Sequence, residues 1–230
     1  MNLILFGPPG AGKGTQAHLI KQRHELALIA TGDILREEIK KKSSLGLEVE
    51  QVMAEGRFPS DEIILKIFEE CLENVKEQGV ILDGLPRTLN QAQKIDQIFK
   101  RVDRTVDIVI QISVDEDELI KRLSSRIVCK QCGTPYMEDS SFHPKGVCYE
   151  CSGRDFIRRP DDEPEAIKTR LKVYNDQTKP LVEYYLNQGL LKVVDGMKPV
   201  AEVNAQIEAL LGATQVLTRK SGCLYSAQDI

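Results

Sequence analysis

The sequence predicts an α/β protein built on a parallel sheet, and three observations carry this prediction. Short apolar runs alternate with longer amphipathic stretches along most of the chain, and a glycine-rich loop follows the first run directly. The runs are apolar on both faces, as strands covered by helices on both sides must be. The runs predict strands at Leu3–Phe6, Leu26–Ile29, Val80–Leu82, Val106–Ile112 and Leu191–Val194.

Helical patterns fill most of the chain between these runs. They predict helices at Lys13–Gln22, Gly32–Lys42, Asp61–Gln78, Leu89–Phe99, Glu116–Arg126, Glu163–Asn187 and Val200–Leu211. Two stretches interrupt the alternation of strand and helix: residues 30–59, which have a helical pattern but no strand, and the cysteine-bearing residues 127–160. We expect both to be lobes inserted into one core. From about Ala213 the chain is polar and aperiodic, which predicts a flexible tail over 213–230.

Composition narrows the class of protein. Of the 230 residues, 41% are hydrophobic, which is enough for a buried core and argues against disorder. The 31 basic and 35 acidic side chains leave a net charge of −4, so the basic excess of a nucleic-acid or membrane-surface binder is missing. No stretch reaches the ~18–20 apolar residues of a membrane span. We therefore expect a soluble, cytoplasmic protein that binds neither nucleic acid nor membrane.

The glycine-rich loop has the form GxxxxGK and lies between a predicted strand and a predicted helix, which is the context that gives this motif its meaning. Its backbone N–H groups would form an anion cradle at the start of a helix, and Lys13 would reach the β- and γ-phosphates. A glycine turn that binds nothing is the weaker alternative, because strand, lysine and helix are in register. The residues of this loop predicted to contact phosphate are Gly10, Ala11, Gly12, Lys13, Gly14 and Thr15.

One position in this loop departs from the usual motif. Gly14 follows the lysine where Ser or Thr usually binds Mg²⁺, and Thr15 comes one residue later. The metal must then rely on water and on a carboxylate. Asp83 ends the predicted strand Val80–Leu82, at the edge where α/β sheets place their ligands. We therefore predict that Asp83 holds Mg²⁺ through water, although Asp before Gly is also an ordinary turn.

Four of the six cysteines form two pairs, Cys129/Cys132 and Cys148/Cys151. The spacing C-x₂-C-x₁₅-C-x₂-C is typical of a structural zinc site with a closed thiolate shell. Zinc would stabilise a lobe too small to build its own core. Iron could occupy the same ligands, and free thiols or disulfide-prone pairs are the alternative. Cys71 is expected in the core, and Cys223 carries no signal.

Seven segments, in this order and spacing, closely resemble the adenylate kinase family over residues 1 to about 212. They are GPPGAGKGTQA (7–17), TGDILR (31–36), DGLPRT (83–88), RLSSRIVC (122–129), RRPDD (158–162), KTRL (168–171) and VDGMKPVAEV (194–203). The resemblance implies a P-loop core with a five-stranded parallel sheet flanked by helices. It places this core at 1–29, 60–124 and 163–212, an inserted AMP-binding lobe at 30–59 and a zinc-stabilised lid at 125–162.

The resemblance also implies the reaction, which is reversible phosphoryl transfer from Mg-ATP to AMP giving two ADP, for adenine nucleotide homeostasis. The protein would act by positioning, charge stabilisation and lid closure, without a general base, and as a monomer. It assigns catalysis to Lys13, Arg87, Arg126, Arg159 and Arg170. It assigns ATP contacts outside the loop to Arg122, Arg126, Thr134, Tyr136 and Lys198. It assigns AMP contacts to Thr31, Arg36, Arg57, Phe58, Pro59, Gly84, Arg87, Gln91, Arg159 and Arg170.

Within the AMP site, the resemblance implies that Thr31 lies near the base, that Arg36 and Arg87 hold the phosphate and that Gln91 reads the adenine edge. Two departures concern this site. Leu85 stands where the family usually has Phe, and GRFPSDE (56–62) replaces the commoner GxLVPDE. These departures leave open how strictly the site selects adenine over other bases of the monophosphate.

Two alternative functions remain. One is a kinase of another monophosphate, or one that uses GTP as donor, although Thr31 and Gln91 favour AMP. The other is a nucleotide-gated switch whose cysteine lobe binds a partner or nucleic acid. The acidic balance and the second phosphate-binding set at Arg36 and Arg87 count against a switch.

Overall fold

The computed structural model of the chain describes residues 1–138 and 146–222, with side chains described as far as Thr214. Its centre is a five-stranded sheet of order β2-β3-β1-β4-β8 in which every pair of neighbours is parallel. The strands are β1 (Asn2–Phe6), β2 (Leu26–Ala30), β3 (Gly79–Asp83), β4 (Ile108–Ser113) and β8 (Leu191–Asp195). The predicted fold class and all five predicted strands are therefore confirmed.

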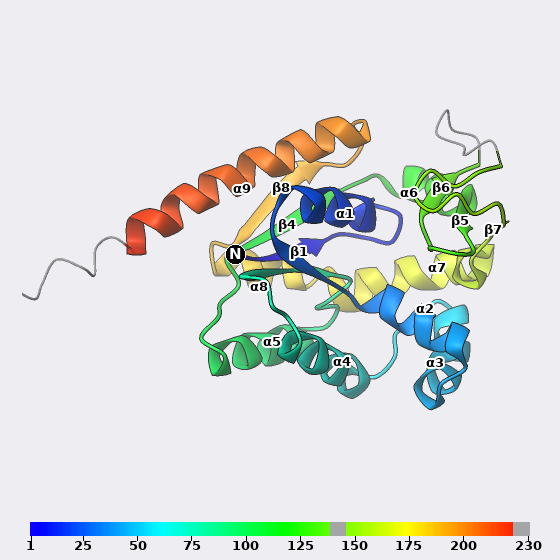
Figure 1. Cartoon of the computed structure of the whole chain (residues 1–230), viewed down its shortest axis with the longest axis horizontal. Coiled ribbons are helices and arrows are strands. Elements are labelled where there is room, and N and C mark those ends of the chain that lie inside the picture. The colour runs from blue at the N-terminus through cyan, green and yellow to red at the C-terminus, as the bar shows by residue number, and fades with distance from the viewer. Residues whose placement is uncertain (139–145, 223–230) are drawn as a thin grey trace, which may run out of the picture.

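Helices cover both faces of this sheet (Figure 1). Alternate residues of a strand point to opposite faces, so Leu3 and Leu5 join one apolar cluster while Ile4 and Phe6 join the other. The first cluster includes α1 (Lys13–Arg23), α6 (Glu116–Ser124) and α9 (Val200–Gly222). The second includes α4 (Asp61–Glu73), α5 (Leu89–Arg101) and α8 (Leu181–Asn187). This layering places the carboxyl ends of the strands, and the loops after them, at one edge.

Two lobes project from the core on the same side of the molecule (Figure 1). The helical lobe, residues 30–59, consists of α2 (Thr31–Lys41) and α3 (Ser44–Ala54), which confirms helix without strand. The cysteine lobe, residues 125–162, contains an antiparallel sheet of order β6-β5-β7. Its strands are β5 (Arg126–Cys129), β6 (Pro135–Met137) and β7 (Phe156–Ile157). The sequence did not predict them, because strands this short carry no readable periodicity.

The predicted helix Glu163–Asn187 is not continuous. A 3-10 turn, η1 (Pro160–Asp162), precedes α7 (Pro164–Val173), and a π-helical turn, η2 (Tyr174–Thr178), separates α7 from α8. Pro180 has no N–H to donate, so the regular hydrogen-bond ladder stops, and Lys179 N donates five residues back to Tyr174 O at 2.8 Å. This interruption of the helix directs the Thr178 side chain toward the candidate active site described below.

The other helix ends also differ from the prediction. Helix α4 ends at Glu73 rather than Gln78, and α6 ends at Ser124, so that Arg126 begins a strand. Helix α9 continues to Gly222, so residues 213–222 of the predicted tail are helical, because no proline interrupts the propagating ladder. Residues 223–230, the rest of that tail, lie outside the described residues. Within the described ranges, none of the helices has the length and apolarity needed to cross a bilayer.

Candidate active site

The glycine loop connects β1 to α1, as predicted. Gly12 is the N-cap of α1 and has φ 93°, a left-handed conformation that glycine adopts without steric cost. Lys13 opens the helix and folds back over the loop, where its Nζ donates to Gly7 O at 2.8 Å and to Pro8 O at 2.9 Å. The loop therefore brings a helix N-terminus and a cation together, which is the arrangement that binds phosphate.

Asp83 lies at the carboxyl end of β3, beside this loop. An ideal Cβ on Gly14 would lie 3.3 Å from Asp83 Oδ2, so the glycine that departs from the usual motif leaves room for the carboxylate. Burial raises the pKa of Asp83, and Lys13 opposes that rise. Burial also lowers the pKa of Lys13 to about 8, which Asp83 opposes and Arg87 reinforces. A carboxylate here suits Mg²⁺, which prefers oxygen ligands.

Asp162 organises two of the predicted arginines. Its side chain is 2% exposed and accepts from Arg126 Nε at 2.7 Å and from Arg170 Nη1 at 2.8 Å. Asp161 lies 3.1 Å from the same Arg170 nitrogen. Sequence reasoning assigned neither carboxylate a role. The available signal was the acidic pair that follows Arg158-Arg159-Pro160, a pattern expected where buried guanidinium groups need counter-charges.

Positive charge nevertheless exceeds negative charge in this region. Burial and, after it, the neighbouring Arg36 and Arg126 together lower the pKa of Arg159 to about 9. Burial lowers the pKa of Arg87 to about 10, with Arg170 next in effect. The Arg159 Nε atom is buried without a hydrogen-bond partner among the described residues. Crowded cations that depress one another's pKa, with a buried donor unsatisfied, are what an anion site requires.

The predicted AMP contacts Thr31, Gly84 and Arg87 meet at the loop after β3. Gly84 O accepts from Thr31 Oγ1 at 3.2 Å and from Arg87 Nε at 2.7 Å. Gly84 has φ 76°, which side-chain-bearing residues rarely adopt, and a Cβ there would lie 2.9 Å from Arg87 Nη2, so another residue would strain the backbone and displace the guanidinium. Arg36 extends from α2 and forms an ion pair with Asp33 one turn before it.

Gln91 also lies in this region, but its side chain is buried and bonds to other residues of the protein. It is 1% exposed, its Oε1 accepts from Arg87 N at 2.7 Å and its Nε2 donates to Asp61 Oδ1 at 2.7 Å. Asp61 also accepts from Thr88 Oγ1 at 3.0 Å, and sequence reasoning did not single it out. Reading of the adenine edge by Gln91 stays a prediction.

The segment predicted to contact the AMP base lines a cavity of about 300 Å³. Its walls include Arg57, Phe58 and Pro59, together with Asp61 and Thr88. A larger cavity, of about 770 Å³, lies between the end of α3 and the start of α7 and includes Arg57 and Arg159. Leu85 is 1% exposed and packs in the core, so its side chain offers no surface to a ligand.

The predicted ATP contacts outside the loop fall into two groups. Arg122 Nε donates to Glu118 at 2.8 Å and its Nη2 donates to Gly196 O at 3.0 Å, next to the loop that carries the exposed Lys198. Thr134 and Tyr136 instead direct their side chains to the cysteine cluster. An ATP contact at these two positions stays a prediction.

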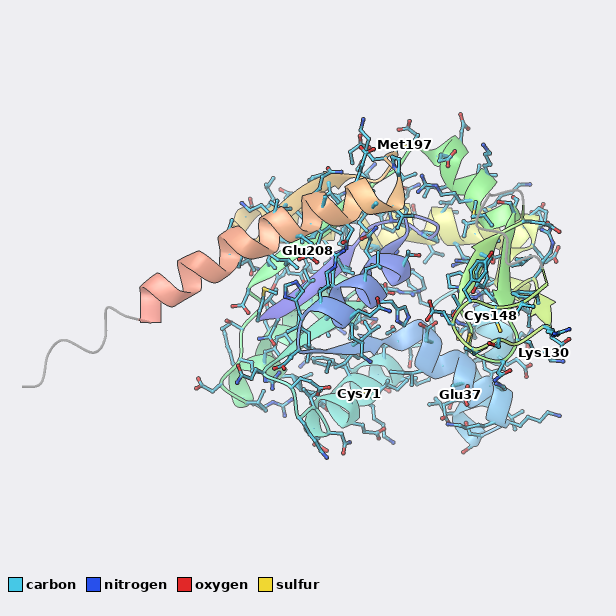
Figure 2. All side chains as sticks on the ribbon, turned by 45° about the horizontal axis from the view of Figure 1, so that its top comes forward. Glu37, Cys71, Lys130, Cys148, Met197 and Glu208 are labelled. Carbon is cyan, nitrogen blue, oxygen red and sulfur yellow. The ribbon has the colours of Figure 1, made fainter. Side chains whose placement is uncertain are left out.

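The four paired cysteines converge inside the cysteine lobe, where Figure 2 labels Cys148. Their sulfur atoms all lie within 4.8 Å of one another, with Cys129 Sγ 3.6 Å from Cys151 Sγ and Cys132 Sγ 3.5 Å from Cys148 Sγ. A tetrahedral zinc with Zn–S bonds of about 2.3 Å requires sulfur separations near 3.8 Å, so the cluster fits this metal. Cys71 is half-buried on α4, and Cys223 lies outside the described residues.

Tyr136 adds a contact that the sequence did not predict. Its hydroxyl oxygen accepts from Tyr149 N at 3.0 Å and lies 3.2 Å from Cys148 Sγ, so its hydrogen is available to the sulfur. Burial raises the pKa of the Cys148 thiol, but hydrogen bonds from Tyr136 and the backbone outweigh it and lower the pKa to about 6. A stabilised thiolate is the form that binds metal.

The strand, glycine loop and helix, with arginines arriving from both lobes, define a P-loop protein that binds more than one phosphate group. The family model for adenylate kinase matches residues 5–190. The chain is 42% identical over 216 residues to an adenylate kinase of Novosphingobium aromaticivorans, covering 93% of this chain and 100% of that one. It is 45% identical over 215 residues to an adenylate kinase of Lactobacillus delbrueckii subsp. bulgaricus, covering 92% and 98%. The chain belongs to the adenylate kinase family.

Proposed function

We propose that this protein catalyses reversible phosphoryl transfer from Mg-ATP to AMP, giving two ADP. The observation that carries the proposal is the convergence of cations from four parts of the chain: Lys13 from the glycine loop, Arg87 from the loop after β3, Arg126 and Arg159 from the cysteine lobe and Arg170 from α7. Two nucleotides with facing phosphates repel each other strongly. A site with surplus positive charge offsets that repulsion.

The chain's own residues supply positioning and charge rather than covalent chemistry. Lys13 and the loop N–H groups would hold the ATP phosphates, and Arg36 and Arg87 would hold the phosphate of AMP. Arg126, Arg159 and Arg170 would face the group in transfer, and Asp161 and Asp162 would keep Arg126 and Arg170 in place. No general base is needed, because the AMP phosphate is already an anionic nucleophile. The helical lobe would serve as the AMP-binding lobe, and the cysteine lobe as the lid that excludes water.

Two metals belong to the proposal. Asp83 would hold Mg²⁺ through water beside the ATP phosphates, where the ion supplies charge neutralisation during transfer. Cys129, Cys132, Cys148 and Cys151 would hold a structural Zn²⁺, because four thiolates leave no ligand position open for a reacting water.

We also propose that the protein is a monomer, that it acts in the cytoplasm and that it has no nucleic-acid partner. The net charge of −4 supports the absence of a nucleic-acid partner. Four closely spaced cysteines with the spacing of metal ligands are typical of a reducing compartment.

The test is ADP formation from Mg-ATP with AMP, GMP, CMP, UMP or no acceptor. We expect product only with AMP, two ADP for each ATP consumed. Lys13→Met should lower turnover by several orders of magnitude, whereas Ala at the exposed Arg101, 66% exposed on α5, should leave it unchanged.

The other outcomes separate the alternatives. Turnover with a different monophosphate would keep the phosphate chemistry and overturn the choice of base. Tight ATP binding without any transfer to AMP would instead support a nucleotide-gated switch.

A further inference from the structure

Phe58 contacts the guanidinium group of Arg87. The Arg87 Cζ atom lies over the Phe58 ring, 4.3 Å from its centroid. Phe58 is half-buried and belongs to the segment between α3 and α4, whereas Arg87 lies on the loop between β3 and α5. The contact therefore joins the helical lobe to the core at the predicted AMP site.

Hydrogen bonds fix the rest of Arg87. Its N–H donates to Gln91 Oε1 at 2.7 Å, its carbonyl accepts from Thr178 Oγ1 at 2.9 Å and its Nε donates to Gly84 O at 2.7 Å. These bonds hold the backbone and one edge of the guanidinium. The Phe58 ring covers one face of the same group, and a planar cation held at an edge and a face has its orientation defined.

The surroundings make an aromatic ring more useful here than an aliphatic side chain. Arg87 is half-buried, and two other cations, Arg170 and Arg36, repel it. The face of a phenyl ring carries the negative part of its quadrupole, so it stabilises a desolvated cation that lies over it. A leucine could fill the same volume but offers no such electrostatic attraction.

We propose that Phe58 is a positioning residue for the AMP phosphate: its ring holds the Arg87 guanidinium in the plane that meets that phosphate. The proposal rests on the proposed function, which assigns Arg87 to AMP. Leu85, at the position where the family usually carries Phe, is buried in the core, whereas the aromatic contact to Arg87 comes from Phe58 of the helical lobe. Phe58 also lines the cavity next to Arg57 and Pro59, so it links the base side of the site to the phosphate side.

The kinetic consequence follows from where Arg87 acts. A residue that binds AMP equally in the ground state and in the transition state changes KM more than kcat. Phe58→Leu should therefore raise KM for AMP by about 5- to 30-fold, the range expected for losing a desolvated cation–π contact. The KM for ATP and kcat should change by less than about threefold, and Phe58→Tyr should restore the wild-type KM for AMP because its ring keeps the attraction.

The decisive measurement replaces Phe58 with mono-, di- and trifluorophenylalanine in the full chain. Fluorination keeps the shape of the ring while weakening the negative charge on its face. We expect log KM for AMP to rise steadily with each fluorine, the trifluoro protein approaching Phe58→Leu. The matched control is the same series at Phe99, which is buried on α5 and packs against Phe68, where KM should stay constant.

The outcomes distinguish this inference from the proposed function. A flat fluorine series at Phe58 in a protein that phosphorylates AMP would overturn the positioning role alone, whether or not Phe58→Leu folds. If the wild type binds AMP without transferring phosphate, Kd for AMP replaces KM in the same series, and a flat series again overturns the role. A wild type that neither binds nor phosphorylates AMP would overturn the proposed function and this inference with it.

Discussion

The helical lobe and the cysteine lobe both bring arginines toward the glycine loop, yet they are stabilised differently. In the helical lobe, Leu35 of α2 and Val49 of α3 are 2% and 1% exposed and belong to the same apolar cluster as the sheet. In the cysteine lobe, Ile127, Tyr136 and two of the cysteines form a separate small cluster. One lobe is an extension of the main core, and the other has a core of its own.

This difference explains why only one lobe carries paired cysteines. Burial of apolar area in a large shared cluster stabilises α2 and α3 without further help. A cluster of a few side chains cannot offset the conformational entropy lost by ordering three short strands. Thiolate ligands that bind a metal can supply the missing free energy, because metal binding then drives folding of the lobe.

Removing the metal should reveal the difference in stability between the two lobes most clearly. Structural zinc sites contribute apparent binding free energies of about 10–16 kcal/mol, so chelation, or Cys148→Ser, should unfold the cysteine lobe. We expect β5, β6 and β7 to lose hydrogen-exchange protection while α2, α3 and the sheet keep theirs. Hydrogen exchange read by mass spectrometry, with zinc content measured in parallel, tests this.

Two variants calibrate that experiment. Cys71→Ser on α4 removes a thiol outside the cluster and should leave both zinc content and exchange unchanged. Tyr136→Phe keeps all four ligands but removes the hydrogen bond to Cys148, and should weaken zinc binding by about 10- to 100-fold in chelator competition. Protection in β5–β7 that survives complete metal removal would show that the small cluster is sufficient by itself.

Removing one arginine from each lobe should next reveal different kinetic roles. Arg159→Ala in the cysteine lobe should lower kcat by about 100- to 1,000-fold, because in the proposed reaction it removes a preorganised charge at the transferring group. Arg36→Ala in the helical lobe should raise KM for AMP by about tenfold and lower kcat much less, since it removes one charged contact to a bound phosphate. Steady-state kinetics with AMP varied test both. Equal effects on kcat would mean that the lobes do not divide the work in this way.

The helical lobe has its own weak point at Gly46. A Cβ on this residue of α3 would lie 2.2 Å from Glu38 O of α2, so Gly46→Ala must push the two helices apart. Overpacking of this kind costs about 1–3 kcal/mol, and we expect a lower melting temperature with exchange protection lost in α2 and α3 only. The control is Gly212→Ala, where a Cβ on α9 meets nothing within 4 Å and should stabilise by about 0.5–1 kcal/mol.

The smallest expected effect belongs to the glycine loop, which both lobes face. Lys13 has a pKa of about 8 in the free protein, so it is charged below that pH and neutral above it. Polyphosphate binding favours the charged form. Affinity for Mg-ATP should therefore be constant below pH 8 and fall by up to about tenfold per pH unit above it, with about one proton taken up on binding at pH 9. Calorimetry at pH 9 in buffers of different ionisation enthalpy measures that proton, and no uptake would place the lysine pKa well above 9.

Much of the fold followed from local pattern. The five strands, the glycine loop with Lys13, Asp83 at a strand end and the spacing of the four cysteines are each visible within a short stretch of sequence. Such features depend on the chain's immediate neighbours, through side-chain alternation, backbone freedom and ligand spacing. For that reason they can be predicted without tertiary contacts.

The elements that could not be predicted from sequence are those whose structure depends on contacts between distant segments of the chain. The π-helical turn at Tyr174–Thr178 carries Thr178 to Arg87 O, and the three short strands of the cysteine lobe exist only as partners of one another. Asp162 became an anchor for Arg126 and Arg170 only once the fold had buried it.

The sequence by itself determined the class of fold, the glycine loop and the paired spacing of the four clustered cysteines of this member of the adenylate kinase family. Tertiary structure alone decided which side chains meet across elements. Phe58 contacts Arg87, Asp61 accepts a hydrogen bond from Gln91, and the Tyr136 hydroxyl contacts Cys148. The physical reason is that a residue's type fixes what it can donate, accept or cover. Which partner it meets depends on packing between segments far apart along the chain.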